Sequence, residues 1–272
     1  MTNATTKFKL PAQVSGLFGV VLTIAIWWLL AVTVFANVGA RPDGTGGAIP
    51  TPLQVVEQLW VDGFEFYWRN GSVTLAEAGL GFLWGNSLAL VVAMVALILP
   101  RLESLATQIA VITYCIPIVA IGPIVRLIVG APGESEPAPA AIVLAALSVF
   151  FTTVVGALTG VKSADKRTLD VVTAYGGNSW HRLIKVQLLS ALPSILAAFK
   201  IAAPAAFLGA ILGEYVGGPD LGFGPAMVNA QQSLEIARVW GVALVSGAIA
   251  GAGYALFSLV SKLVTPWAKG DK

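Results

Sequence analysis

The chain has 272 residues, of which 57% are apolar and only 11% are charged. A soluble domain carries roughly 25% charged residues, so this composition excludes an ordinary soluble protein and indicates a membrane protein with several spans. The net charge of +2 is too small to indicate a nucleic-acid partner. The single cysteine, Cys115, and the single histidine, His181, exclude an intrachain disulfide and a metal site of clustered Cys or His.

Long apolar runs separated by polar segments predict an all-α protein with six transmembrane helices, each near the ~20 residues that a bilayer needs. The first run is longer than the core of a signal peptide, which spans ~7–15 residues, so we expect it to be a retained helix. The expected segments are a cytoplasmic tail at 1–13, helices at 14–36, 73–99, 104–129, 140–161, 188–213 and 239–264, external loops at 37–72 and 214–238, and a cytoplasmic loop at 162–187.

Three of these segments have local features of their own. Apolar residues at helical spacing from 53 to 62 predict a short helix at the membrane surface within the first external loop. The helix at 73–99 carries Gly79, Gly81 and Gly85, and small residues let helices approach closely in lipid. Pro117 and Pro123 predict a kink in the helix at 104–129.

Lysine and arginine residues predict the orientation. With a cytoplasmic N-terminus, the inner segments hold eleven of them and the outer loops hold three, Arg41, Arg69 and Arg238. Because positive residues concentrate on the cytoplasmic side, both termini and the loop at 162–187 are expected there.

The loop at 162–187 predicts two short helices joined by a tight turn. Ser163 is placed to cap a helix that runs to Tyr175, Gly176 and Gly177 suit the turn, and Asn178 is placed to cap the next helix. This elbow has apolar residues at helical spacing and basic residues around them. Periodicity alone leaves two interpretations open, namely packing against the chain's own helices or docking of a soluble partner.

The residue pattern resembles a known family. Asp170-Val-Val-Thr-Ala-Tyr-Gly176, followed by Val186-Gln-Leu-Leu-Ser-Ala-Leu-Pro193, resembles the cytoplasmic signature loop of permease subunits in bacterial ATP-binding-cassette importers, above all those for nitrate, sulfonates and taurine. The resemblance covers about residues 50–265. Asp170 stands where the family usually has Glu, and Val172 stands where it has Ala.

The resemblance implies a type I importer permease of the bacterial inner membrane, with the elbow coupled to an ATPase. The residues it implies for this coupling are Asp170, Val172, Tyr175, Gly176, Gly177, Trp180, His181, Arg182 and Pro193. It also implies a homodimer of permeases, two cytoplasmic ATPase subunits and a periplasmic or lipid-anchored binding protein. The chain has no phosphate-binding Gly-x4-Gly-Lys-Ser/Thr loop, so we expect no enzyme activity and no cofactor in it, with ATP-Mg bound by the partner.

Two charged residues are hypothetical contacts in the substrate path, Arg126 near the outer end of its helix and Glu214 at the end of the fifth helix. The solute implied is a small anion such as nitrate, a sulfonate or taurine, or a vitamin-precursor pyrimidine. Glu77 is expected at the outer interface. The alternative is a secondary transporter or channel that works alone; it needs carboxylates in mid-membrane for ion coupling, and the sequence predicts none there. A membrane enzyme is disfavoured because His and Cys are single.

Overall fold

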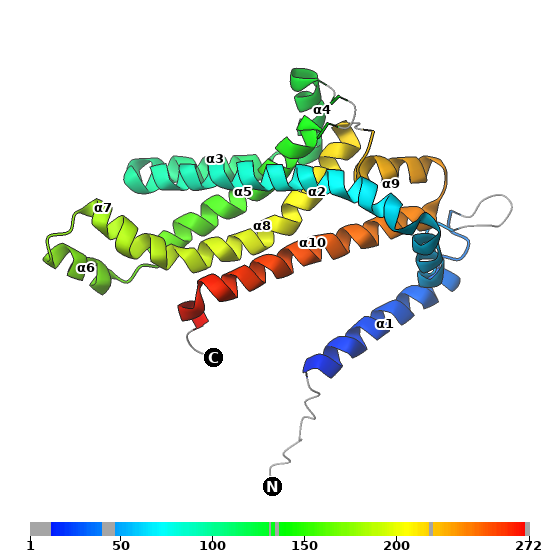
Figure 1. Cartoon of the computed structure of the whole chain (residues 1–272), viewed down its shortest axis with the longest axis horizontal. Helices are drawn as coiled ribbons and strands as arrows, with labels where there is room; N and C mark the ends of the chain where they lie inside the picture. The colour runs from blue at the N-terminus through cyan, green and yellow to red at the C-terminus, as the bar shows by residue number, and fades with distance from the viewer. Residues whose placement is uncertain (1–11, 40–46, 131, 134–135, 218–219, 270–272) are drawn as a thin grey trace, which may run out of the picture. The chain divides into compact units, whose positions relative to one another are not determined.

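The computed structural model describes residues 12–39, 47–130, 132–133, 136–217 and 220–269, and every regular element in those ranges is helical (Figure 1). Most of the expected tail at 1–13 lies outside them. The chain divides into two compact units, one of residues 1–64 and 230–241 and the other of residues 65–229 and 242–272. Three helices, α2, α9 and α10, begin in one unit and end in the other.

The smaller unit contains α1 (Ala12–Val32), the first turns of α2 (Pro52–Ile98) and the start of α10 (Ile236–Val264). Trp27 of α1 stacks on Trp240 of α10 with ring centroids 5.2 Å apart. The two indole N–H groups donate to backbone carbonyls of the segment before α2, Trp27 to Pro50 at 3.0 Å and Trp240 to Ala48 at 3.3 Å. Because each half-buried indole N–H finds an acceptor, the aromatic pair joins three segments of this unit.

The larger unit contains most of the helices. In chain order they are the rest of α2, a short 3₁₀ turn (Pro100–Leu102), α3 (Glu103–Cys115), α4 (Ile118–Val129), α5 (Pro139–Lys162), α6 (Lys166–Ala174), α7 (Ser179–Arg182), a π-helical turn (Leu183–Gln187), α8 (Leu188–Gly217), α9 (Phe223–Gln232) and the rest of α10. In Figure 1, α6 and α7 lie at one end of α8 and α9 lies at its other end.

Helices α5 and α8 form the centre of this unit, and small residues line their contact. A Cβ added at Gly156 would meet Cβ of Ala198 at 2.7 Å, and one added at Gly160 would meet Cβ of Ser194 at 2.8 Å. Gly209 and Gly213 of α8 lie equally close to α5 further along. In lipid, where apolar burial gives helices no drive to associate, such close backbone packing stabilises the pair.

The second helix packs on α5 in the same way, as the glycines of the sequence indicated. Cβ atoms at Gly81 and Gly85 would collide with Ala145 and Ala146 of α5, whereas Gly79 has open space around it. A buried hydrogen bond from Thr153 Oγ1 to Asn86 Oδ1 joins the same two helices. The α2–α5 contact therefore combines close backbones with one interhelical hydrogen bond, both of which stabilise helix pairs in a membrane.

Helix α2 consists of two helical stretches that meet at a kink at Gly63, where φ is 70° and ψ is 168°. The stretch before the kink agrees with the short helix expected from 53 to 62, whereas the stretch after it begins before residue 73, inside the expected external loop. The kink expected in the helix at 104–129 is confirmed, because α3 and α4 meet there at 92°. The bend follows from Pro117, because the residue before a proline is driven from the α conformation, and Ile116 is extended with ψ of 130°.

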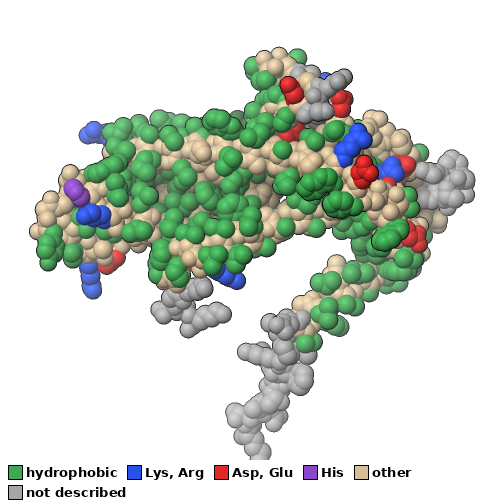
Figure 2. Space-filling view, in the orientation of Figure 1, with side chains coloured by type: hydrophobic (Ala, Val, Ile, Leu, Met, Phe, Trp, Pro, Cys, Tyr) green, Lys and Arg blue, Asp and Glu red, His purple; other side chains and the backbone are tan. Residues whose placement is uncertain are grey.

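The described residues contain five helices long and apolar enough to cross a membrane, or six if the bent pair α3 and α4 counts as one span. The six expected spans thus agree with the structure when that pair crosses as one. Figure 2 shows hydrophobic side chains over most of the visible face of the larger unit, with basic and histidine side chains gathered where α6 and α7 lie.

Candidate functional site

The elbow begins two residues later than the sequence indicated. The cap of α6 is Asp165, whose Oδ1 accepts from the backbone N–H of Arg167 at 3.3 Å. Ser163, predicted as that cap, instead ends α5, and its hydroxyl donates to the Gly160 carbonyl at 2.6 Å. That prediction was wrong because the apolar periodicity of α5 continues through Lys162, which leaves Ser163 in a helix C-terminus.

The turn between α6 and α7 requires both of its glycines, for different reasons. Gly176 has φ of 76°, a left-handed conformation that side chains with a Cβ rarely adopt. Gly177 lies so close to α6 that an added Cβ would stand 2.5 Å from Cγ1 of Val172 and 2.6 Å from its carbonyl oxygen. The prediction of a glycine-dependent turn is confirmed.

Helix α7 starts at the predicted cap and leads into α8 without a break. Asn178 Oδ1 accepts from the backbone N–H of His181 at 3.0 Å and lies 2.7 Å from Nδ1 of the same residue. The next five residues, Leu183–Gln187, form a π-helical turn in which the N–H of Leu188 donates to the Leu183 carbonyl. Single π turns inside helices are frequent at functional sites.

The elbow has an inner face that packs on its own helices and an outer face that does not. Leu169, Leu183 and Val186 are buried. In contrast, Tyr175 is 90% exposed and Trp180 is 58% exposed. A shallow hollow opens on the outer face, lined by Val171, Val172, Tyr175, Gly176, Gly177, His181 and Lys185. Exposed aromatic residues around a hollow are typical of a protein interaction site.

The structure brings most of the predicted coupling residues to this elbow. Asp170 is exposed on α6, His181 is exposed on α7 and Arg182 is half-buried at the end of α7. Pro193 lies apart from them, inside α8 and beyond the π turn. Its neighbours Ala191 and Ser194 contact Gly160 of α5, so it belongs to the α5–α8 contact and not to the elbow's outer face.

A second polar site lies at the other end of α8, around the first turn of α9. Three consecutive backbone N–H groups there donate to side chains from distant parts of the chain. Gly222 donates to Oδ1 of Asn70 at 3.3 Å and Phe223 to Oγ1 of Thr74 at 2.9 Å. Gly224 donates to Oε2 of Glu214 at 2.6 Å. Since the first N–H groups of a helix lack partners in the helix itself, these side chains act as caps supplied by α2 and α8.

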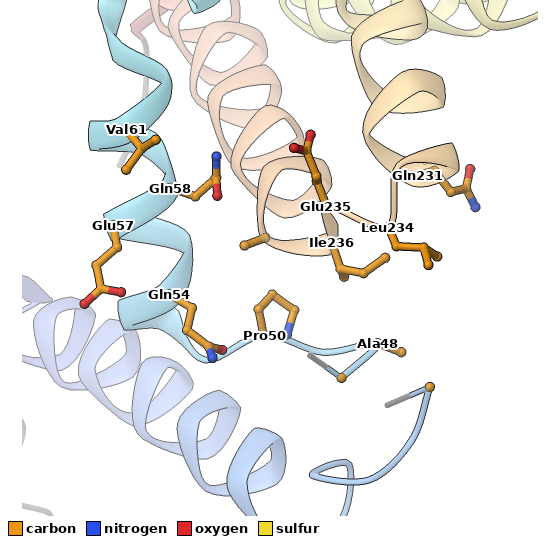
Figure 3. Close-up of a pocket in the computed structure, with 13 residues that line it drawn as sticks. Ala48, Pro50, Gln54, Glu57, Gln58, Val61, Gln231, Leu234, Glu235 and Ile236 are labelled. Carbon is orange, nitrogen blue, oxygen red and sulfur yellow. The ribbon is translucent and has the colours of Figure 1, made fainter. Parts of the chain in front are cut away.

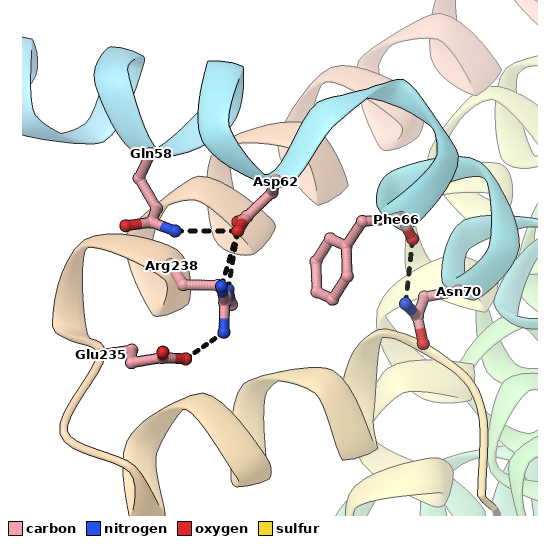
Figure 4. A network of polar contacts seen from close by, with 6 residues as sticks. All are labelled: Gln58, Asp62, Phe66, Asn70, Glu235 and Arg238. Carbon is pink, nitrogen blue, oxygen red and sulfur yellow. Dashed lines mark hydrogen bonds and ion pairs between the residues drawn. The ribbon is translucent and has the colours of Figure 1, made fainter.

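Asn70 is itself held in place by its own helix, because its amide nitrogen donates to the Phe66 carbonyl at 2.9 Å (Figure 4). This bond leaves the amide oxygen directed at the N–H of Gly222. Gly222 has φ of 132° and packs so closely on the Glu214 carboxylate that a Cβ there would lie 2.5 Å from Oε1. The turn at Gly222 therefore packs around the Glu214 carboxylate, and its N–H groups also donate to side chains of α2.

Glu214 contacts a second carboxylate, that of Glu77 on α2. The side chain of Glu77 is fully buried and Glu214 is 1% exposed. Glu77 Oε1 accepts from the N–H of Ala138, the residue before α5, at 2.6 Å. Each carboxylate thus uses one oxygen to cap a different helix, α5 for Glu77 and α9 for Glu214, and a helix N-terminus favours a negative charge.

The remaining oxygens of this pair, Oε2 of Glu77 and Oε1 of Glu214, are buried and have no other hydrogen-bond partner among the described residues. Two ionised carboxylates about 4 Å apart repel by about 4 kcal/mol at an effective dielectric constant of about 20. Burial adds a desolvation cost of several kcal/mol for each ion. The pair is therefore the most demanding electrostatic feature in the described part of the chain.

The residues of this polar cluster were largely missed in the sequence. Glu77 was expected at the outer interface, and it does lie roughly one bilayer thickness from the Ile98 end of α2, but inside the bundle. Asn70, Thr74 and Glu77 lie four and three residues apart, so they share one face of α2. That polar stripe on an otherwise apolar helix was the signal available.

The two hypothetical substrate contacts lie in different surroundings. Arg126 is exposed near the end of α4, and Glu214 is enclosed in the cluster just described. No ion pair joins them among the described residues. Their role in a substrate path stays a prediction.

The smaller unit holds a hollow of about 880 Å³ whose lining is mainly apolar and carries several polar side chains (Figure 3). Side chains from the start of α2 and from the segment before α10 line it, among them Gln54, Glu57, Gln58, Leu234 and Glu235. An ionic network lies nearby, in which Arg238 pairs with Asp62 at 2.8 Å and with Glu235 (Figure 4). Gln58 also donates to Asp62 at 2.8 Å. This network fixes α2 to α10 within the unit.

Comparison with known proteins places the chain in a transport context. Residues 85–270 match the family model described as binding-protein-dependent transport system inner membrane component. A protein of Haemophilus influenzae, named a probable ABC transporter permease protein, is 29% identical over 196 residues, which is 72% of this chain and 77% of that protein.

Two other relatives carry names with a solute. The formylaminopyrimidine transport permease protein ThiX of Halalkalibacterium halodurans is 23% identical over 242 residues, 89% of this chain and 94% of that protein. The protein of Bacillus subtilis named putative aliphatic sulfonates transport permease protein SsuC is 27% identical over 271 residues, 96% of this chain and 88% of that protein.

Proposed function

The chain belongs to the inner membrane components of binding-protein-dependent transport systems, and we propose that it forms the solute path of an importer whose elbow docks on a cytoplasmic ATPase subunit. The family is one of transport permeases and not of catalysts. One observation carries the docking proposal, namely the outward-facing Tyr175 and Trp180 on an elbow whose inner face is packed on its own helices. Exposed aromatic side chains of this kind are the usual anchors of a protein interface.

The elbow is suited to pass a movement of the ATPase into the membrane. It continues through the π turn directly into α8, so no flexible linker separates the docking surface from the transmembrane helix. We propose that Val172, Tyr175, Gly176 and Gly177 shape the dock and that Asp170, His181 and Arg182 supply polar contacts at its rim.

We propose that two copies of the chain pair in the bacterial inner membrane and that each binds one ATPase subunit, which supplies ATP-Mg. The charge distribution supports cytoplasmic termini and a cytoplasmic elbow. Pairing is supported by the count of five or six spans in one chain, which is few for a path that opens alternately to each side.

We propose that the hollow of the smaller unit lies on the outer side in this orientation and receives part of the solute-binding protein. Its lining of Gln54, Gln58, Glu57 and Glu235 favours a partner with hydrogen-bond donors or basic side chains. The replacement Glu57→Lys is expected to weaken binding-protein association. Glu65→Lys on the same helix is the matched control, because Glu65 is exposed and lies outside the hollow.

The solute is proposed as a small organic anion such as a sulfonate, or a vitamin-precursor pyrimidine. The names of SsuC and ThiX support these two classes. We expect the binding protein to select between these two classes of solute. The solute is therefore tested with the binding protein whose gene accompanies that of the permease.

The docking proposal is tested by purifying the complex from membranes and measuring how much ATPase subunit accompanies the permease. Tyr175→Ala and Trp180→Ala are expected to reduce the bound ATPase at least tenfold and to abolish ATP-driven uptake. Trp267→Ala is the matched control, since Trp267 is also an exposed tryptophan, 57% exposed, but lies near the C-terminus and outside the elbow. Full ATPase association in both elbow variants, or uptake that continues without ATP, would overturn the proposal.

A further inference from the structure

We propose that Glu77 and Glu214 together bind one proton, and that this proton joins α2 to α8 and fixes the first turn of α9. The site lies at the far end of α8 from the elbow, so ATPase docking does not use it (Figure 1). The proposal goes beyond the transport role and does not depend on which solute is carried.

The geometry requires a donor between the two carboxylates. One oxygen of each side chain accepts a hydrogen bond from a backbone N–H, that of Ala138 for Glu77 and that of Gly224 for Glu214. The other oxygen of each is buried, and the two carboxyl groups contact each other. An ionised carboxylate has only acceptors, so two ionised groups would present acceptor to acceptor. A single proton turns one of them into a donor and converts the contact into a short, charge-assisted hydrogen bond.

The surroundings favour one proton over two. Two helix N-termini point at the pair, that of α5 through Ala138 and that of α9 through Gly224. These donors stabilise one negative charge, which a second proton would remove.

No other charged side chain enters the cluster within the described residues, so the charge of the site is set by the two carboxylates. The other titratable groups on the elements around it are exposed, half-buried at its edge or many turns away. They are Glu57, Asp62, Glu65, Tyr67 and Arg69 in α2, Arg126 in α4, Glu136 before α5, Tyr215 in α8, Asp220 before α9, Arg238 and Tyr254 in α10, and Lys162, Lys200 and Lys262 further along α5, α8 and α10.

The proton has a structural consequence because the pair also holds the turn before α9. Gly222 packs against the Glu214 carboxylate, and Phe223 between the two glycines is fully buried. Loss of the proton places two like charges in contact, which forces the carboxylates apart and removes the cap from α5 or from α9. The first turn of α9 is then released from α2 and α8, so the site acts as a proton-dependent latch.

The direct test is infrared difference spectroscopy of the complete importer complex in lipid, titrated with pH. A protonated carboxyl group gives a C=O stretching band that an ionised one lacks. We expect such a band at neutral pH in the wild type and its loss in Glu77→Gln and in Glu214→Gln. Absence of the band in the wild type at neutral pH would overturn the proposal.

Thermal unfolding of the same samples gives a second readout. Each single Gln variant places an amide N–H where the proton stands, so both are expected to melt near the wild-type temperature at neutral pH. The melting temperature of the wild type is expected to fall over the pH range in which its infrared band disappears. The melting temperatures of the Gln variants are not expected to fall over that range. Glu77→Ala and Glu214→Ala are expected to melt lower at every pH. Gln variants as unstable as the Ala variants would contradict a shared proton.

A bound cation is the competing explanation for two carboxylates in contact. Replacing sodium and potassium by choline is expected to leave the melting temperature unchanged, and a lowered melting temperature would overturn the proposal in favour of a metal ion. None of these readouts requires the elbow to function. Failure of ATPase docking would therefore leave them intact and would be recognised separately.

Discussion

The backbone N–H of Phe223 donates a hydrogen bond of 2.9 Å to Oγ1 of Thr74, a residue 149 positions earlier in the chain. The neighbouring N–H groups of Gly222 and Gly224 also donate to distant side chains. The start of α9 is therefore specified by α2 and α8 and not by its own sequence. Changes in the polar stripe of α2 should act on α9 first.

Replacing Thr74 by Val keeps the shape of the side chain and removes the acceptor for the Phe223 N–H. A buried N–H without a partner costs about 1–3 kcal/mol, so the free energy of unfolding should fall by that amount. Denaturant titration in detergent checks it. Thr74→Ser, which keeps the hydroxyl, should retain most of the stability. Equal losses in both variants would show that packing of the methyl group, and not the hydrogen bond, is what matters.

At the elbow, Gly176→Val should cost about 1–3 kcal/mol locally, because a β-branched residue is strained at φ of 76°. We expect the chain to insert in the membrane normally and to lose most of its bound ATPase. Gly176→Asn is the control, because asparagine tolerates the left-handed conformation and no atom lies within 4 Å of the added Cβ. Copurification measures the effect, and full ATPase binding by the Val variant would refute the role of this turn.

In the smaller unit, Arg238→Gln removes the ion pair of Asp62, whose side chain is 1% exposed. Loss of one partner from a fully buried pair costs about 3–5 kcal/mol. Arg238 is partly exposed, so we expect a smaller loss of about 1–3 kcal/mol. Adding Asp62→Asn to this variant should restore stability, since no buried charge then remains. The melting temperatures of the wild type and of the two variants check this, and a double variant no more stable than Arg238→Gln would contradict it.

Arg126→Gln tests the hypothetical substrate contact. If Arg126 contacts an anionic solute, loss of about 1.5–3 kcal/mol of charge-assisted bonding should lower uptake about tenfold or more, with little change in expression. Arg101→Gln, at the expected cytoplasmic end of α2, is the control. Unchanged uptake would assign Arg126 to the membrane interface, where its long side chain reaches water.

The transmembrane helices were largely predictable because their signals are local. Helix α5, expected at 140–161, spans Pro139–Lys162, and α10, expected at 239–264, spans Ile236–Val264. A proline or polar residue beside a long apolar run marks each end. Helix α2 was harder because its first turns are only partly apolar, and because the stretch after the kink at Gly63 begins before the apolar run that was expected to start at residue 73.

The elbow was predictable in its turn and less so in its ends. Gly176 and Asn178 act through their own backbone and side chain, so the sequence is enough to assign them. Ser163 and Asp165 are both acceptable caps, and the choice between them depends on how far α5 extends. The outward direction of Tyr175 depends on what the rest of the bundle leaves uncovered, and no local pattern encodes that.

The buried carboxylates were not predictable as a pair. Glu77 and Glu214 lie on different helices, and only the packing of α2 and α8 around the turn at Gly222 brings them together. Hydropathy alone moves a charged residue to the membrane surface, which is why Glu77 was expected there. Inside the bundle, the N–H groups of other helices offset the cost of burying these carboxylates. Such capping between helices cannot be recognised from the pattern within one helix.

The glycine and alanine contacts between α5 and α8 have a mechanical consequence. Backbones this close, at Gly156, Gly160, Gly209 and Gly213, cannot slide past each other without collision. We therefore expect the two helices to move together, with the elbow at one end and the turn at Gly222 at the other. If the proposed ATPase moves the elbow, that movement should reach the far end of the pair, where hydrogen bonds hold the start of α9.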